Sequence, residues 1–165
     1  MSNEKELPNL GTPEEASKKM KESYLLFLDS CCKFITICDY YSKYENQGSA
    51  LPSNFMDLYL ANKKKLEKAT ADDIYDMLAF YAAFRLDYLA EVKENIEQYF
   101  EILSGNVDES GLSDYDKCCD RLAIRDGFVD FTNDFVDANR EIAKSKEIDS
   151  LFNDPDYDPN CIQKI

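Results

Sequence analysis

Histidine is absent from this 165-residue chain, and its absence removes several classes of chemistry. Without an imidazole there is no Ser-His-Asp or Cys-His nucleophile system, no histidine-ligated metal centre and no histidine pH switch. Five glycines and five prolines are too few for a β-sandwich, a β-barrel or a phosphate-cradling loop protein. No run of 18 apolar residues exists to span a bilayer, and residues 1–10 lack the apolar core of a secretory signal. We therefore expect a cytoplasmic protein.

Basic residues are also scarce relative to acidic ones. Lys and Arg number 19 against 33 Asp and Glu, which gives a formal net charge of -14. Such a field repels the phosphates of nucleic acids and anionic lipids, so we expect no direct nucleic-acid binding and no membrane binding. The apolar content of 44% and the aromatic content of 13% nevertheless predict a folded chain with the size of one domain.

The apolar residues that are present recur with the period of a helix. Thr12, Pro13 and Glu15 supply an N-cap, a proline at the first helical position and an acid three residues past the cap. From there to about Glu45, apolar residues follow one another at spacings of three and four, which predicts a helix about 33 residues long. This apolar face comprises Met20, Tyr24, Phe27, Cys31, Phe34, Cys38 and Tyr41.

Further cap signals divide the rest of the chain. Ser53 follows a loop over 46–52 and predicts a shorter helix that ends before Thr70. Thr70 and Asp73 form a capping box that opens a second long helix, which we expect to run without a break to Gly105. Ser113 opens a third long helix, in which the apolar register shifts near Gly127 and predicts a kink or a local slip. Arg85 lies on the apolar side of the second long helix, which predicts a structural ion pair or stacking on tyrosines.

These elements predict an all-α fold: an elongated antiparallel up-down helical bundle of three long helices plus one shorter helix. Residues 1–11 are expected to form a flexible N-terminus and residues 12–148 the bundle domain. Residues 149–165 form an acidic tail that is broken by Pro155 and Pro159. That tail is either mobile or docked as an extended peptide.

Acidic motifs with metal-binding spacing occur in the helical segments, in contexts that argue against metal. Asp72, Asp73 and Asp76 follow the pattern with which isoprenoid synthases hold magnesium, but no second acidic motif accompanies them, and the first turn of a helix favours acids through the macrodipole. Pairs of acids three residues apart, such as Glu91 with Glu94, distantly echo the all-helical nucleotide pyrophosphatases. They leave a small all-α metal-dependent phosphohydrolase as a second alternative function.

The six cysteines are interpreted as reduced packing residues. Five of them, all except Cys161, fall inside helical segments, where a thiol acts as a small apolar group. No single metal ion is within reach of all five, because neighbouring cysteines on a helix point about 100° apart. We therefore expect no cofactor and no metal. The set is Cys31, Cys32, Cys38, Cys118, Cys119 and Cys161.

Acidic residues form two rows at helical spacing, and these are the most informative feature of the sequence. Each row is about 21 to 23 Å long, with carboxylates about 5 to 6 Å apart. The first row is Asp87, Glu91, Glu94, Glu97 and Glu101, and the second is Asp126, Asp130, Asp134, Asp137 and Glu141.

The function predicted from these features is that of a non-enzymatic acidic helical protein-binding module, acting as an adaptor, chaperone or inhibitor. Its partner is expected to be a protein with a basic surface, contacted by the two acidic rows and by Phe152 and Tyr157 of the tail. The alternative is a nucleic-acid mimic that inhibits a DNA- or RNA-binding protein, because the carboxylate spacing approximates that of phosphates along one strand. Whether the chain forms a homo-oligomer is left open.

Overall fold

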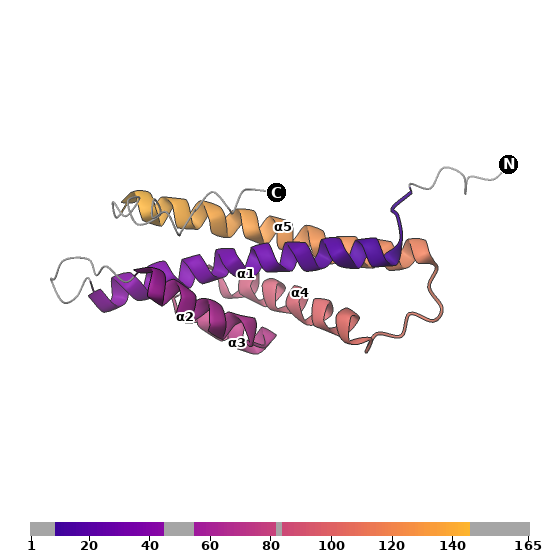
Figure 1. Cartoon of the computed structure of the whole chain (residues 1–165), viewed down its shortest axis with the longest axis horizontal. Coiled ribbons are helices and arrows are strands. Elements are labelled where there is room, and N and C mark those ends of the chain that lie inside the picture. The colour runs from indigo at the N-terminus through magenta and orange to yellow at the C-terminus, as the bar shows by residue number, and fades with distance from the viewer. Residues whose placement is uncertain (1–8, 45–54, 82–83, 146–165) are drawn as a thin grey trace.

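Five α-helices make up the computed structural model, which describes residues 9–44, 55–81 and 84–145. The helices are α1 (Pro13–Tyr44), α2 (Phe55–Glu67), α3 (Ala71–Phe80), α4 (Leu86–Ser104) and α5 (Asp114–Ser145) (Figure 1). The described part of the chain holds no strand, so the predicted all-α class is confirmed. Within those ranges no helix combines the length and the apolar character needed to cross a membrane.

The helix starts predicted from cap residues are present. Thr12 Oγ1 accepts a hydrogen bond from the Glu15 amide at 3.1 Å, just before α1 begins at Pro13. Thr70 and Asp73 form the complete capping box of α3. Ser113 Oγ accepts from the Asp116 amide at 3.1 Å, at the start of α5. Ser53, the predicted cap of the shorter helix, lies outside the described residues.

The second long helix was predicted as one element, and that prediction is wrong. The chain leaves α3 after Phe80 and begins α4 at Leu86, with Arg85 in an extended conformation (φ -66°, ψ 146°) as its N-cap. The predicted stop at Gly105 is confirmed, because this glycine takes the left-handed conformation (φ 74°) that ends α4.

Aromatic packing accounts for the break. Tyr81 and Phe84 flank the corner and both place their rings against Phe34 of α1, at centroid distances of 6.4 and 5.7 Å. Phe84 also packs on Phe135 of α5 at 4.6 Å. If α3 and α4 were one straight helix, residues 71–80 would extend past the core. The chain reversal between α3 and α4 instead lets Ile74 and Leu78 of α3 be fully buried.

Of the kink or local slip predicted near Gly127 in the third long helix, the slip is not present. α5 is unbroken from Asp114 to Ser145, and its buried positions include a continuous series from Cys118 to Phe135 at spacings of three and four. Tyr115, Cys119 and Leu122, which suggested the shift, are only half-buried beside this continuous face. Gly127 instead permits a close approach, since a Cβ there would lie 2.9 Å from the side chain of Asn95 on α4. The buried positions are Cys118, Arg121, Ile124, Phe128, Phe131, Thr132, Phe135, Val136 and Asn139.

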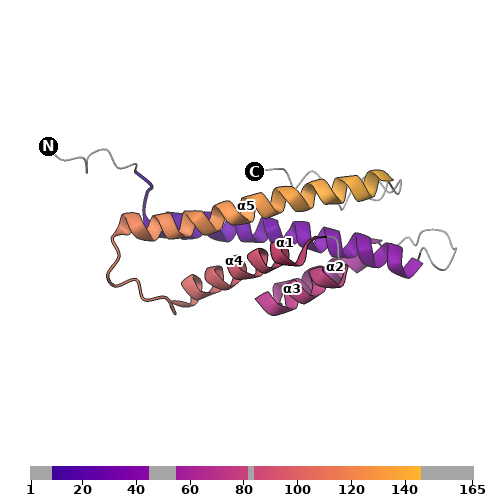
Figure 2. The same cartoon turned by 180° about the vertical axis from the view of Figure 1, so that it is seen from behind.

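The direction of α5 follows from its contacts with α1. Cys118 Sγ lies 3.6 Å from the carbonyl oxygen of Gly11, and Asn139 Nδ2 donates to the carbonyl of Ser30 at 3.1 Å, so α1 and α5 run parallel (Figures 1 and 2). The predicted arrangement, an antiparallel up-down bundle of three long helices plus one shorter helix, is not confirmed, because the described residues form five helices.

The core is an aromatic seam between α1 and α5, closed by α4. The ring of Phe27 packs on Phe128 at 5.3 Å, and that of Phe34 packs on Phe135 at 5.5 Å. Tyr24 stacks on Tyr99 of α4 at 4.3 Å. The seam therefore joins the middle of α1 to α5, and Figure 2 shows these two helices side by side along the elongated molecule.

We predict that the Phe135→Ala variant loses about 3 to 5 kcal/mol of unfolding free energy, because this fully buried ring contacts Phe27, Phe34 and Phe84. Urea unfolding followed by circular dichroism measures the loss. Phe80→Ala is the matched control, since that ring is 78% exposed and its loss should change stability by about 0.5 kcal/mol or less. Equal losses in the two variants would contradict the described core.

Candidate acidic interface

All ten carboxylates of the two predicted acidic rows are exposed in the structure. On α4 the row lies opposite the buried face formed by Leu89, Val92 and Ile96. On α5 it lies opposite Phe128 and Phe135, at 100° per residue. Both rows therefore point away from the core.

Hydrogen bonds between α4 and α5 bring the two rows onto adjoining outer surfaces. Tyr88 donates its hydroxyl proton to Asp134 Oδ2 at 2.6 Å, and Asn95 Nδ2 donates to the carbonyl of Ile124 at 3.1 Å. The helices are antiparallel neighbours in this register, so the start of the α4 row lies beside the middle of the α5 row. Burial and the bond to Asp134 raise the pKa of Tyr88, which keeps its phenol protonated as a donor.

Few cations lie among these acids. Residues 86–142 contain fifteen Asp and Glu and five Lys and Arg. Lys93 pairs with Asp72 of α3 at 2.6 Å, and Arg121 pairs with Glu109 at 2.8 Å, so both are directed away from the two rows. Arg125 contacts Asp126 at 2.7 Å. The outer surface of the α4 and α5 pair is therefore predominantly anionic.

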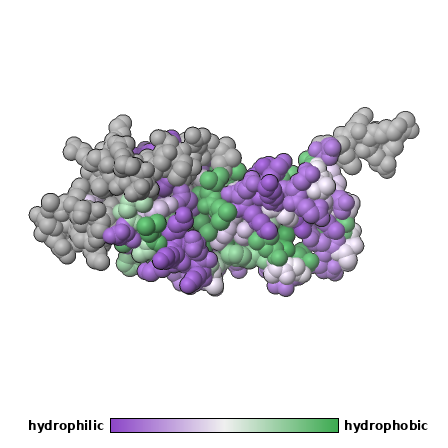
Figure 3. All heavy atoms as spheres, in the orientation of Figure 1, coloured by the Kyte–Doolittle hydropathy of each residue, from purple (hydrophilic) through white to green (hydrophobic). Residues whose placement is uncertain are grey.

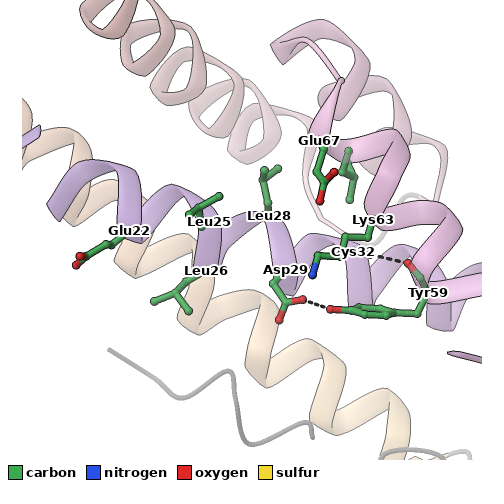
Figure 4. A pocket seen from close by; sticks show the side chains of 10 residues that line it. Glu22, Leu25, Leu26, Leu28, Asp29, Cys32, Tyr59, Lys63 and Glu67 are labelled. Atoms are coloured by element: carbon green, nitrogen blue, oxygen red, sulfur yellow. Dashed lines mark hydrogen bonds between the residues drawn. The ribbon is translucent and has the colours of Figure 1, made fainter. Parts of the chain in front are cut away.

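A recess between α1 and α2 has a volume of about 710 Å³. Figure 4 shows Leu25, Leu26 and Leu28 of α1 on one side and Lys63 and Glu67 of α2 on the other. Leu25 is 64% exposed, and the face drawn in Figure 3 carries such apolar areas between larger hydrophilic ones. Its charged lining consists of three acids, Glu22, Asp29 and Glu67, and one cation, Lys63.

A polar cluster joins α1 to α2 and α3 and was not predicted. Tyr59 of α2 hydrogen-bonds Asp29, which also lies 3.3 Å from Lys33 Nζ. Tyr81, just after α3, hydrogen-bonds Asp39. The only sequence signal was that these polar residues interrupt an otherwise apolar half of α1, and the sequence does not show which helices supply their partners.

The described cysteines are free thiols on α1 and α5. Burial raises the pKa of Cys32 to about 12 and that of Cys38 to about 11, and it also raises the pKa of Cys31. Such groups stay protonated near neutral pH, whereas metal ligation and redox chemistry need the thiolate. Their environment therefore favours packing. Cys161 lies outside the described residues.

The other candidate chemical groups have structural partners. Asp73 completes the α3 capping box, and Asp72 pairs with Lys93. Arg85 was placed on the apolar side of a helix and is instead 82% exposed at a helix start, 3.4 Å from Asp87. Over residues 9–44, 55–81 and 84–145, no three acids or cysteines converge as a metal site would require.

Arg121 is a buried contact that sequence reasoning missed. Its guanidinium makes two hydrogen bonds to Glu109, at 2.8 and 2.9 Å, and a third to Ser17 Oγ of α1 at 2.9 Å. The side chain thus joins the α4–α5 loop to the starts of α1 and α5. The sequence did contain one signal: Arg121 lies three residues after Cys118, which places both on the same face of the helix. A charged residue was nevertheless not expected on a buried face.

Comparison with known proteins identifies no relative. The chain matches no family model, and no curated protein or solved structure is similar to it. The partner-binding candidates Phe152 and Tyr157 lie outside the described residues, so only the two acidic rows are placed by the structure.

The Glu109 contact predicts a defined pH dependence. Hydrogen bonds from Arg121 hold the pKa of Glu109 below its ordinary value of 4.5. A depressed pKa contributes stability above the ordinary value, and this contribution is lost as pH falls toward the folded-state value. The wild type should therefore exceed Glu109→Gln in unfolding free energy at pH 7, and the difference should shrink below about pH 4.5. Urea titrations at pH 7 and pH 3.5 test this, and a pH-independent difference would contradict it.

A second prediction concerns the thiols. Replacing the fully buried Cys31 by Ala should cost about 1 kcal/mol through a small cavity, without any other change in behaviour. A chelator such as EDTA should leave the urea midpoint of the wild-type chain unchanged. Stoichiometric zinc in the purified protein, measured by atomic emission, would show that the packing interpretation is wrong.

Proposed function

We propose that this chain is a non-enzymatic, acidic protein-binding module, and that it receives a basic surface of a protein partner on the outer faces of α4 and α5. The observation that carries the proposal is the exposure of all ten row carboxylates on adjoining surfaces with few cations, two of which, Lys93 and Arg121, pair with acids outside the rows.

The energetics support a functional interpretation of these surfaces. Like charges three or four residues apart on a helix each cost a few tenths of a kcal/mol, and the aromatic core offsets that cost. A concentrated field of one sign attracts an oppositely charged protein and speeds its association by about tenfold to a thousandfold at low salt. The rows would therefore govern chiefly the rate of encounter and its salt dependence.

A nucleic-acid mimic is the second candidate. Two exposed rows of anions that run side by side in opposite directions resemble the disposition of phosphates on paired strands, and this arrangement follows from the register of α4 and α5. In that case the partner is itself a DNA- or RNA-binding protein. Competition by a double-stranded oligonucleotide then separates this candidate from a general protein-binding module.

The test uses the full chain immobilised as bait for a native lysate at low and at high salt, with identification of the captured proteins by mass spectrometry. The first variant combines Glu94→Lys, Glu97→Lys and Glu101→Lys, and the second combines Asp130→Lys, Asp134→Lys and Asp137→Lys. We expect a basic protein to be retained at low salt, and each variant to slow its association about tenfold or more in surface plasmon resonance.

The matched control reverses three exposed acids away from the interface, Asp57→Lys, Glu67→Lys and Asp76→Lys, and so changes the net charge equally. The control should associate at close to the wild-type rate, because the position of the charges matters as well as their number. If all three variants and the wild type bind with the same rate and salt dependence, the rows are solvated surface only and the proposal fails.

A further inference from the structure

Between the second half of α4 and the first third of α5 the surface forms a recess with a volume of about 540 Å³. These helices line it at positions that recur at spacings of three and four, so each presents one face to it. Its volume is in the usual range of ligand sites. We call it the α4–α5 recess. α4 contributes Asn95, Gln98, Glu101 and Ile102, α5 contributes Asp120, Ala123 and Ile124, and the loop between them contributes Val107.

The charged groups of the α4–α5 recess are acidic. The side chains of Glu101 and Asp120 are exposed, and among the described residues neither a lysine nor an arginine lines the hollow. Arg121, next to Asp120 in the sequence, directs its guanidinium to Glu109 and Ser17. The recess therefore holds two carboxylates that no cation in its lining balances.

The rest of the lining is apolar or accepts hydrogen bonds. Ile102, Val107 and Ile124 supply aliphatic surface, and Val107 is 37% exposed. Gln98 donates from Nε2 to Glu94 at 3.4 Å, which leaves its Oε1 oxygen as a further acceptor. An occupant that matches this lining has an aliphatic stem and ends in a cation with several N–H donors.

We propose that the α4–α5 recess receives an arginine side chain of the basic protein partner. Since Glu101 belongs to the α4 row, the recess is part of the anionic surface described above, and the identity of its occupant rests on the proposed function. The methylenes of arginine lie on the aliphatic lining, while its guanidinium, with five N–H donors in a planar fork, meets the two carboxylates. Lysine has three donors and a more strongly hydrated charge, so it uses these acceptors less completely.

A divalent metal ion is the less suitable occupant. Magnesium and calcium take about six to eight oxygen ligands, whereas the recess offers two carboxylates. Its aliphatic lining also adds nothing to the binding of a bare ion. An arginine side chain uses both parts of the lining.

A seated arginine divides the kinetic roles within the anionic surface. Charges at the rim of an interface chiefly set the rate of encounter, whereas a side chain that is buried on binding chiefly slows dissociation. The two acidic rows should therefore govern association, and the α4–α5 recess should govern dissociation. This difference allows the recess and the rows to be tested separately.

Titration of the full nitrogen-15-labelled chain with N-acetylarginine methylamide, followed by two-dimensional NMR, tests the recess without a partner. We expect saturable shifts of the amide signals of Ile102 and Ala123. N-acetylcitrulline methylamide, which has nearly the same shape without the charge, should bind there about tenfold or more weakly. The Glu101→Gln, Asp120→Asn variant should weaken binding of the arginine probe by a similar factor. The control variant Glu67→Gln, Asp76→Asn, with the same change in net charge, should keep it.

A charge-neutral variant tests the recess in the captured complex. Ala123→Leu fills the recess without changing the net charge, and Ala61→Leu, at an exposed position of α2, is the matched control. In surface plasmon resonance Ala123→Leu should raise the dissociation rate of the basic partner about tenfold and leave its association rate close to that of the wild type. Ala61→Leu should change neither rate.

The outcomes separate this proposal from the proposed function. If reversal of the rows slows association but Ala123→Leu leaves dissociation unchanged, the proposed function stands and the arginine proposal is overturned. Equal binding of the arginine and citrulline probes would also overturn it. If reversal of the rows leaves association unchanged, the proposed function fails, and the NMR titration still decides whether the recess binds a guanidinium.

Discussion

Parallel packing of α1 against α5 through aromatic rings is the contact on which the rest of the structure depends. Phe27 and Phe34 meet Phe128 and Phe135, and the four rings are fully buried. Two parallel helices cannot be joined by a short loop, so the intervening chain must travel back along them. α2, α3 and α4 provide that return, and each adds side chains to the edge of the seam.

The direction of α4 in turn determines where the acidic surface lies. α4 must run opposite to α5 to bring the chain to the start of the last helix, and Gly127 allows Asn95 to approach closely. Both helices bury their apolar faces in the core, so their acids face outward. The anionic surface proposed as a partner site is therefore a consequence of how the last two helices pack.

Polar contacts are concentrated where helices end or cross. Arg121 binds Glu109 and Ser17 at the end of the molecule where α1 and α5 begin. Asp29 and Asp39 accept hydrogen bonds from Tyr59 and Tyr81 where α2 and the α3–α4 corner meet α1. Partly buried carboxylates and a buried guanidinium are costly without partners, and these contacts supply a partner at each of the three crossings.

The sequence by itself determined the features that depend on residues a few positions apart. Thr12, the Thr70 and Asp73 box, Gly105 and Ser113 act through hydrogen bonds or backbone conformation within four residues, so the ends they mark were predictable. The two acidic rows were equally predictable, because helical spacing alone puts their members on one face.

Only the tertiary structure decided the break between α3 and α4, the parallel direction of α5 and the burial of Arg121. The break depends on Phe34 and Phe135, far from Tyr81 and Phe84 in sequence, and their packing overrides a continuous helical period. Arg121 is buried because Glu109 and Ser17 converge on it, and periodicity along a single helix carries no information about such partners.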